Sequence, residues 1–309
     1  MIYSGLSYPG SKRRVMDRLL PLFPDGIEDW REPFFGSGAV TFAFLQSNKS
    51  MDCKRLLVGD LAPEIWAYHQ GCKEAPREAA YIATEWFKRE VPTHSKLIGM
   101  SITDTDYEKV REQVISEGLN FWKILQTVDT SALNIAQRCA RTFLVNRISF
   151  SGMGDSGSMS KDQLCKFRVE HTQKIIDVSE LLQRVEIINQ PFQVTMADTD
   201  KDKSFVFLDP PYYAQEGSGL YGRNGDTHHG FPHKEFAEFT KNLNCKWFVT
   251  YDDSPFVRKM FEGYHIVPFQ FDYTLAGKKS EDALAGEELL IANYQIESDA
   301  SYDDYDDIL

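Results

Sequence analysis

The residues of this chain best suited to chemistry are four in a row, Asp209-Pro210-Pro211-Tyr212. They follow Ser204–Leu208, a run of mostly aliphatic and aromatic residues that predicts a buried strand. Because two prolines cannot continue a hydrogen-bonded ladder, the strand must end here, and in open α/β sheets such strand ends open into the ligand-binding crevice. A carboxylate and a carbonyl can accept the two N–H hydrogens of a planar amine while a tyrosine ring stacks on it. The same residues also fit a simple turn with a packed tyrosine, so the motif alone leaves both interpretations open.

A second candidate site lies at a strand-to-helix turn near the start of the chain. Residues 27–31 predict a strand that leads into the turn Glu32-Pro33-Phe34-Phe35-Gly36-Ser37-Gly38, with a helix after it. Glycines at such a turn let the backbone approach a ligand closely, and the helix presents free N–H groups. A second strand over 55–59 ends in Asp60, 22 positions after Gly38, where doubly wound nucleotide folds hold ribose hydroxyls. The combination favours a cofactor site over a structural turn.

The segment before these strands, residues 6–14, predicts a turn that leads into a short amphipathic helix. Tyr8 offers a stacking face and Lys12 places a cation close to the turn. A helix cap with solvated basic residues is the alternative interpretation of this stretch.

Residues 62–183 are predicted to be helical, with apolar spacing over 79–89, 106–126, 132–146 and 163–182. Between the last two helices lies a long loop rich in glycine and serine, 149–161, of a kind that is usually functional or disordered. Basic residues alternate there with apolar ones such as Phe150 and Met153, which fits a nucleic-acid contact that pushes into a base stack. A surface loop without such a role is the other interpretation.

The remainder of the chain again alternates strands and helices. Strands are predicted at 185–188, 204–208, 246–250, 265–271 and 289–294, and helices at 233–243 and 255–261. Alternation on both sides of the helical block predicts an α/β fold in which one Rossmann-like sheet is interrupted by an insertion. The predicted division is a catalytic domain at 1–74 and 184–296, a helical target-recognition insert at 75–183, and an acidic disordered tail at 297–309.

The glycine-rich stretch from Tyr213 to Pro232 is long enough to close over a substrate. It holds His228 and His229, with His233 just beyond, but no matching cysteine or carboxylate cluster accompanies them. A metal site is therefore not predicted.

Composition bounds the classes of protein that remain. The chain has 309 residues and a formal net charge of −12, which weighs against tight non-specific binding to nucleic acid. Five of these charges lie in the acidic end, at Asp299, Asp303, Asp304, Asp306 and Asp307, so a local basic groove is still compatible with the total. Five scattered cysteines without a Cys-x-x-Cys pair predict reduced thiols in a cytosolic protein. No signal sequence or stretch of membrane-spanning length is present.

Taken in order, these segments resemble the DNA adenine methylase (Dam-like) family. Tyr8-Pro9-Gly10-Ser11-Lys12 is similar to its N-terminal Trp/Tyr-Ala-Gly-Gly-Lys motif, and the turn at 32–38 to its Glu-Pro-Phe-x-Gly-x-Gly cofactor motif. Asp60 matches the acid of its second strand, and residues 209–212 match its catalytic motif. Further stretches that resemble the family in the same order are 146–147, 251–253 and 288–294. The resemblance covers about residues 5–295, and several motifs in sequence make it specific.

The resemblance implies S-adenosylmethionine as methyl donor and a flipped adenine in double-stranded DNA as acceptor, without a metal, in a cytoplasmic enzyme of prokaryotic or phage origin. The residues that it places at the cofactor are Tyr8, Lys12, Phe34, Gly36, Ser37, Gly38, Asp60 and Asp209. The residues that we expect at the DNA are Asn146, Arg147, Phe150, Ser151, Lys161 and Arg168. The departures are Tyr8 for the commoner tryptophan, Ser11 for glycine, and a loop at 149–161 unlike the recognition hairpin of GATC-methylating members, which leaves the target sequence open.

The expected chemistry requires positioning and electrostatics more than covalent help. We expect Asp209 and the Pro210 carbonyl to accept the two N–H bonds of the target amine, and Tyr212 to stack on a base that has left the duplex. Open alternatives are a catalytically silent DNA-binding protein on the same fold, or an amino-methyltransferase that acts on cytosine, RNA or a glutamine amide. The sequence does not define the oligomeric state or a paired restriction enzyme.

Overall fold

The computed structural model of the chain describes residues 1–8, 10–213, 230–271 and 286–296. Two predicted features lie outside the described residues: most of the glycine-rich stretch, including His228 and His229, and the acidic tail.

The described residues form a seven-stranded sheet with the order β3-β2-β1-β4-β5-β7-β6. The strands are β1 (Asp29–Glu32), β2 (Arg55–Gly59), β3 (Glu186–Ile188), β4 (Ser204–Leu208), β5 (Lys246–Asp252), β6 (His265–Phe271) and β7 (Gly286–Ala292). The first five are parallel, and β7 lies antiparallel between β5 and β6. This mixed sheet, interrupted in the sequence by helices, confirms the predicted α/β class.

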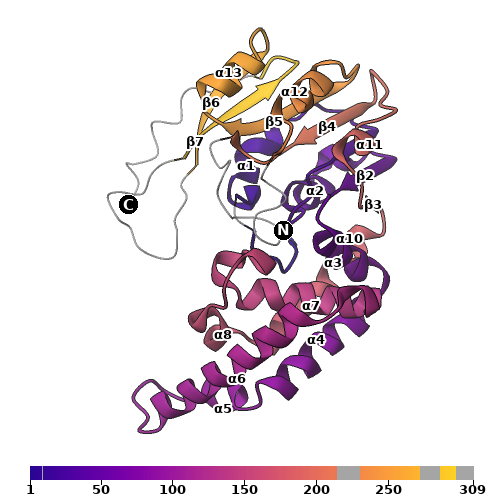
Figure 1. The fold of residues 1–309 in the computed structure, drawn as a ribbon. Helices are drawn as coiled ribbons and strands as arrows, with labels where there is room; N and C mark the ends of the chain where they lie inside the picture. The colour runs from indigo at the N-terminus through magenta and orange to yellow at the C-terminus, as the bar shows by residue number, and fades with distance from the viewer. Residues whose placement is uncertain (9, 214–229, 272–285, 297–309) are drawn as a thin grey trace, which may run out of the picture.

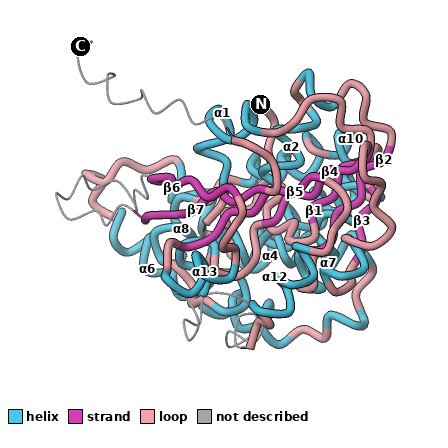
Figure 2. Tube along the Cα trace, turned by 90° about the horizontal axis from the view of Figure 1, so that it is seen from above, coloured by secondary structure: helices cyan, strands magenta, loops and turns pink. Residues whose placement is uncertain are grey.

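Both faces of the sheet are covered by helices. Successive side chains along a strand point to opposite faces, and here both sets are apolar and must be buried. Along β4, Phe205 and Phe207 join one core cluster, whereas Val206 and Leu208 join another. The first cluster includes residues of α1 (Met16–Leu19) and α2 (Ala39–Leu45). The second includes residues of α11 (Phe192–Thr195), α12 (His233–Lys241) and α13 (Pro255–Met260). Figures 1 and 2 show the strands running between these helices.

The helices between β2 and β3 extend away from the sheet and form the lower half of the molecule in Figure 1. They are α3 (Pro63–Glu74), α4 (Pro76–Glu90), α5 (His94–Ile98), α6 (Tyr107–Thr127), α7 (Ile135–Ile148), α8 (Lys161–Lys166), α9 (Gln173–Asp177) and α10 (Ser179–Leu182). None of the helices in the described ranges has the length and apolarity that crossing a membrane requires.

The helix predicted over 163–182 is broken into three. α8 ends at Lys166, because the ψ of 146° at the next residue, Phe167, leaves the helical region, and α9 and α10 follow a short 3₁₀ turn. The break turns the Phe167 ring into the core, where it packs on Phe87 at 4.5 Å between ring centroids. Apolar spacing alone does not reveal such a break, because both a continuous and a broken helix bury the same residues.

The predicted N-terminal helix is also short. Residues Lys12–Val15 form a 3₁₀ turn, α1 adds four residues, and a second 3₁₀ turn spans Leu20–Leu22. Pro21 explains the end, since it lacks the N–H that an α-helix would need at that position.

α3 and α7 approach each other closely at Gly71. A Cβ atom added to Gly71 would lie 2.3 Å from Cys139 Cβ and 2.9 Å from the carbonyl oxygen of Ile135. Both atoms belong to α7, and a backbone carbonyl cannot rotate away. The absence of a side chain at Gly71 therefore sets the distance between the two helices.

We expect Gly71→Ala to lower the free energy of unfolding by about 1–3 kcal/mol, because the added methyl group overpacks this helix pair. Urea denaturation monitored by far-UV circular dichroism measures the change. Gly99→Ala is the matched control, since a Cβ there meets only the carbonyl of Lys96 at an ordinary 3.7 Å. Equal stabilities of the two variants would contradict the close approach.

Candidate active site

The order of the strands reverses between β1 and β4, which lie side by side. At such a point in a parallel sheet the connections leave toward opposite faces, and a crevice opens beyond the carboxyl ends of the strands. The crevice here is a cavity of about 990 Å³. Predicted site residues that line it are Tyr8, Lys12, Phe34, Gly36, Ser37, Asp60, Asn146, Arg147, Phe150, Ser151, Asp209, Pro210 and Tyr212.

The turn after β1 has the backbone shape that only glycine adopts readily. Gly36 and Gly38 have φ values of +48° and +73°, and Gly38 is the residue that caps α2. A Cβ on Gly36 would meet the Tyr8 ring at 3.2 Å. The carbonyl of Gly36 accepts a hydrogen bond of 2.8 Å from Nε2 of the buried His69. Burial lowers the pKa of His69 to about 4, so the ring that holds this turn is neutral at pH 7.

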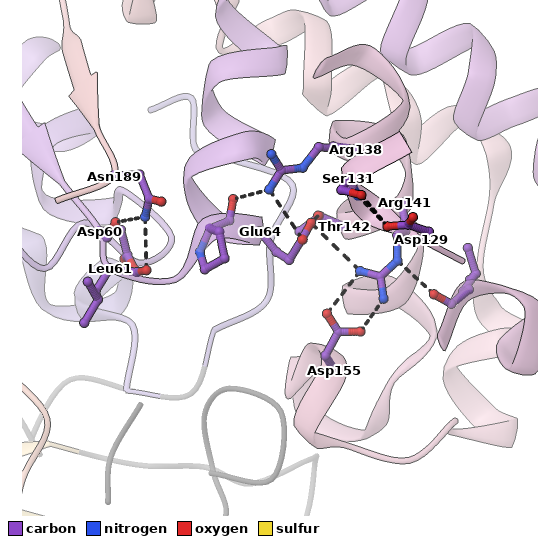
Figure 3. Close-up of polar contacts among 12 residues, drawn as sticks. Asp60, Leu61, Glu64, Asp129, Ser131, Arg138, Arg141, Thr142, Asp155 and Asn189 are labelled. Carbon is purple, nitrogen blue, oxygen red and sulfur yellow. Dashed lines mark hydrogen bonds and ion pairs between the residues drawn. The ribbon is translucent and has the colours of Figure 1, made fainter. Parts of the chain in front are cut away.

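Asp60 connects the end of β2 to the same turn. Its two carboxylate oxygens accept from the backbone N–H of Gly36 at 2.8 Å and of Ala62 at 2.9 Å. The Asn189 amide holds the loop from the other side by donating to the carbonyls of Asp60 and Leu61 (Figure 3). Burial raises the pKa of Asp60 to about 6. Each oxygen of this fixed carboxylate keeps a lone pair that can accept from a ligand.

Glu32, the last residue of β1, is a member of the cavity lining that we did not predict as a site residue. Its side chain is buried and accepts from the backbone N–H of Thr41 at 3.1 Å and from the Thr41 hydroxyl. Burial, with a further contribution from the charges of Asp209 and Asp60, raises the pKa of Glu32 to about 8. The sequence signal that could have identified Glu32 as a site residue is its position where the predicted strand ends and the glycine turn begins.

Asp209 is held by a cation and a hydroxyl. Lys12 Nζ lies 2.9 Å from Asp209 Oδ1 and 3.0 Å from Oδ2, and the Thr250 hydroxyl donates to Oδ1 at 2.6 Å. Lys12 is only 2% exposed. Burial by itself lowers the pKa of Lys12, but the carboxylates of Asp209 and Glu288 outweigh it, and the pKa is raised. The cation near the N-terminus and the acid at the tip of β4 therefore form one ion pair.

Tyr212 takes part in the same cluster. Its hydroxyl lies 2.8 Å from Lys12 Nζ, 3.2 Å from Asp209 Oδ1 and 2.7 Å from Glu288 Oε2. Its ring is stacked at 5.9 Å, between centroids, on the buried ring of Tyr251. Sequence reasoning identified Asp209, Lys12 and Tyr212 but not Glu288, which β7 brings in from 76 positions away.

Asn146 supports the cavity wall from behind. The side chain is buried, and its amide donates to the carbonyls of Ser7 at 2.7 Å and Gly152 at 2.8 Å while accepting from the N–H of Ser7. Both amide hydrogens are thus committed to backbone groups. This geometry gives Asn146 a supporting role in the cavity wall, and its contact with DNA stays a prediction.

The other residues predicted at DNA divide into two groups. Arg147, Phe150 and Ser151 line the cavity, and Phe150 is 60% exposed. Lys161, the exposed first residue of α8, and Arg168, which donates to the carbonyl of Phe167, do not line it.

The glycine- and serine-rich loop after α7 is a compact lobe. Arg141, fully buried on α7, makes two hydrogen bonds to Asp155, at 2.7 and 3.1 Å, and a third from Nε to the Leu125 carbonyl (Figure 3). A bridge between Ser149 and Met159 closes its base. A bidentate pair to a buried guanidinium fixes position as well as charge, so this loop presents Phe150 in a defined place.

Basic side chains from distant parts of the sequence form an electrostatic cluster. Burial, and then the charges of Arg147 and Arg13, lower the pKa of Lys174. The pKa of His171 is likewise lowered by burial and by the charges of Arg147, Lys174 and Arg168. Arg147 is the member of this cluster that lines the cavity. Local sequence gave no signal for this cluster, because its members come from three separate segments.

His233 is buried and its ring bonds to the Tyr251 hydroxyl. Within the ranges that the structure describes, no group of three or more His, Cys, Asp or Glu side chains is arranged to hold a metal ion.

The described fold is an α/β sheet whose crevice holds an acid, two prolines and a tyrosine at the tip of β4. The chain belongs to the D12 class of N6 adenine-specific DNA methyltransferases, whose family model matches residues 8–274.

Two curated relatives match nearly the whole chain. The Type II methyltransferase M1.LlaDCHI of Lactococcus lactis subsp. cremoris is 20% identical over 301 residues, which cover 93% of this chain and 94% of the relative. The Type II methyltransferase M.MjaIII of Methanocaldococcus jannaschii is 22% identical over 312 residues, which cover 94% and 98%. The similarity spans the sheet and the helices between β2 and β3 alike.

The raised pKa of Glu32 predicts a pH dependence of stability. A carboxyl whose folded pKa lies near 8 loses its stabilising contribution as pH rises from about 4.5 through about 8. Glu32→Gln resembles the protonated form, so the stability of this variant relative to the wild type should increase by more than about 1 kcal/mol across that range. Urea denaturation at a series of pH values measures it. The exposed Glu262→Gln is the control, and a pH-independent difference for Glu32→Gln would contradict the prediction.

Proposed function

We propose that this protein transfers a methyl group from S-adenosylmethionine to the exocyclic N6 amino group of an adenine flipped out of double-stranded DNA. The observation that carries the proposal is that Asp209 and Tyr212 face the same cavity as the glycine turn and Asp60. One end of the cavity thus has groups for an amine, and the other has groups for a nucleoside cofactor.

The residues around the turn fit the cofactor. Gly36 keeps a side chain away from the cavity, and the Asp60 carboxylate retains lone pairs for ribose hydroxyls. Gly38 does not line the cavity, and a Cβ there would meet the rings of Phe42 and Phe35. Tyr8 and Phe34 supply apolar surface for its flat base. When bound, S-adenosylmethionine supplies an electrophilic methyl group on a sulfonium.

At the other end, the task of the protein is to make a weak nucleophile react. The lone pair of an exocyclic aromatic amine is conjugated with the ring. Asp209 and the Pro210 carbonyl would accept its two N–H hydrogens, which favours a pyramidal nitrogen and stabilises the positive charge that develops there. Tyr212 would hold the plane of the base, with stacking worth about 1–3 kcal/mol.

The DNA would lie across the mouth of the cavity. Phe150 is an exposed apolar side chain that lines the cavity which the flipped base would enter, and its loop is anchored by the Arg141–Asp155 pair. An apolar wedge on a fixed loop can fill the space left by a flipped base. The cations at Arg13, Arg147 and Lys174 would meet the phosphates next to it, which explains how an acidic protein binds a polyanion locally.

We expect Asp209→Asn to reduce methyl transfer to DNA by at least about 10³-fold, because the charge that accepts the amine hydrogen is lost. The assay measures incorporation of tritiated methyl groups from S-adenosylmethionine into unmethylated DNA of mixed sequence, with RNA of mixed sequence in parallel. Asp202→Asn, on an exposed turn, is the control and should retain full activity. Wild-type activity in the Asp209→Asn variant would overturn the catalytic assignment, and transfer to RNA alone would overturn the DNA substrate.

We expect Arg147→Met and Lys161→Met each to weaken binding to all DNA sequences and to reduce the slope of log K against log salt by about one unit. Fluorescence anisotropy with labelled duplexes at several salt concentrations measures the slope. Lys88→Met on α4, outside the loop predicted to contact DNA, should leave the slope unchanged. An unchanged slope for Lys161→Met would favour the interpretation of that residue as part of a surface loop without a role in binding.

A further inference from the structure

Glu288 is a buried carboxylate beside the proposed acceptor of the target amine. It is 2% exposed, lies on β7 opposite Asp252 of β5, and has Oε2 within 2.7 Å of the Tyr212 hydroxyl and 3.7 Å of Lys12 Nζ. Burying a carboxylate is unfavourable unless donors surround it, and here an ammonium and a hydroxyl do. A second carboxylate thus shares with Asp209 the same ammonium and the same hydroxyl.

The hydrogen bonds around Asp209 show how few acceptor sites it has to spare. Oδ1 receives both the Thr250 hydroxyl, at 2.6 Å, and Lys12 Nζ, at 2.9 Å. Oδ2 receives Lys12 Nζ at 3.0 Å and has no second donor among the described residues. Each carboxylate oxygen has two lone pairs. A third donor at Oδ1 would therefore compete with Thr250 and Lys12, which together hold the carboxylate with Oδ2 open to the incoming amine.

Tyr212 is the group that would compete. Its hydroxyl carries one hydrogen and lies within reach of two carboxylates, at 2.7 Å from Glu288 and 3.2 Å from Asp209. Because O–H···O bonds are most favourable near 2.7–2.8 Å, we assign the hydroxyl of Tyr212 as donating its hydrogen to Glu288 and not to Asp209. Lys12 donates to the lone pair on the same phenol oxygen at 2.8 Å, which is compatible with that direction. Glu288 thus keeps the hydroxyl hydrogen away from Asp209.

Glu288 also sets the charge of the cluster. Lys12 and Asp209 alone form a neutral pair, which offers little net attraction to a nitrogen that becomes positive. When Glu288 is ionised as well, the three groups carry a net charge of −1. In a buried site such a fixed charge acts strongly on nearby developing charge.

Resting on the proposed function, we infer that Glu288 is a positioning residue for methyl transfer. It holds the Tyr212 hydroxyl and the Lys12 ammonium so that Asp209 remains available to the target amine, and it gives the site its net negative charge. Glu288 itself does not touch the substrate.

Two substitutions separate this role from simple packing. Glu288→Gln conserves volume and hydrogen bonding but removes the charge, whereas Glu288→Asp conserves the charge and shortens the side chain. If Glu288 served only to pack β7, Glu288→Gln would be more active than Glu288→Asp, because glutamine conserves the volume of the side chain. The inferred role predicts the opposite order.

The experiment measures kcat and both KM values with tritiated S-adenosylmethionine and unmethylated DNA of mixed sequence, for the wild type and both variants. Glu288→Gln should lower kcat about 10- to 100-fold and change each KM less than about threefold, and Glu288→Asp should retain more of the kcat. Thermal unfolding of each variant reports its folding, and the exposed Glu180→Gln is the control.

The effect of Glu288→Gln on kcat should also depend on the hydroxyl of Tyr212. In a Tyr212→Phe background, Glu288→Gln should cause a smaller loss of kcat than in the wild type, because part of its role has already been removed. A folded Glu288→Gln variant with unchanged kcat, or one more active than Glu288→Asp, would overturn the inference alone. An inactive wild type would instead overturn the proposed function, and this inference with it.

Discussion

The buried ion pair between Lys12 and Asp209 is the interaction on which the site depends. It joins two residues 197 positions apart and closes the N-terminal segment over the tip of β4. Because both charges are largely removed from water, each would be costly without the other. The pair therefore fixes the position of the proposed catalytic acid and, through the same ammonium, the hydroxyl of Tyr212. The geometry of the candidate active site therefore depends on the position of the N-terminal segment.

A second set of polar contacts ties the helical segment to the sheet. Asn146 bonds to the backbone of both Ser7 and Gly152, so the N-terminal segment, α7 and the loop after it share one anchor. Glu64 of α3 lies 3.4 Å from Arg138 and accepts from Thr142, both on α7 (Figure 3). The cavity wall at Ser7, the loop after α7 and α3 are thus all held to α7 by polar contacts.

The sheet and its ligand crevice could be predicted because each strand is marked locally. A strand is recognised as an apolar run, and it ends where a residue such as Asp60, Glu32 or one of the two prolines interrupts that run. Because parallel strands end at a common edge, these residues could be placed together. Element boundaries moved by a few residues, as at β1. The helix predicted over 163–182 was wrong because the turn of Phe167 into the core is decided by its partner Phe87, not by local spacing.

The sequence by itself determined the class of the fold, the family, and the residues whose chemistry is written into short motifs, among them Asp209, Tyr212 and Asp60. Only the tertiary structure decided which distant groups act on them. Glu288 reaches Tyr212 because β7 pairs antiparallel with β5, and the charge of Arg147 on α7 lowers the pKa of Lys174 on α9. Such contacts depend on the order of strands and helices in space, and a local pattern of residues carries no record of that order.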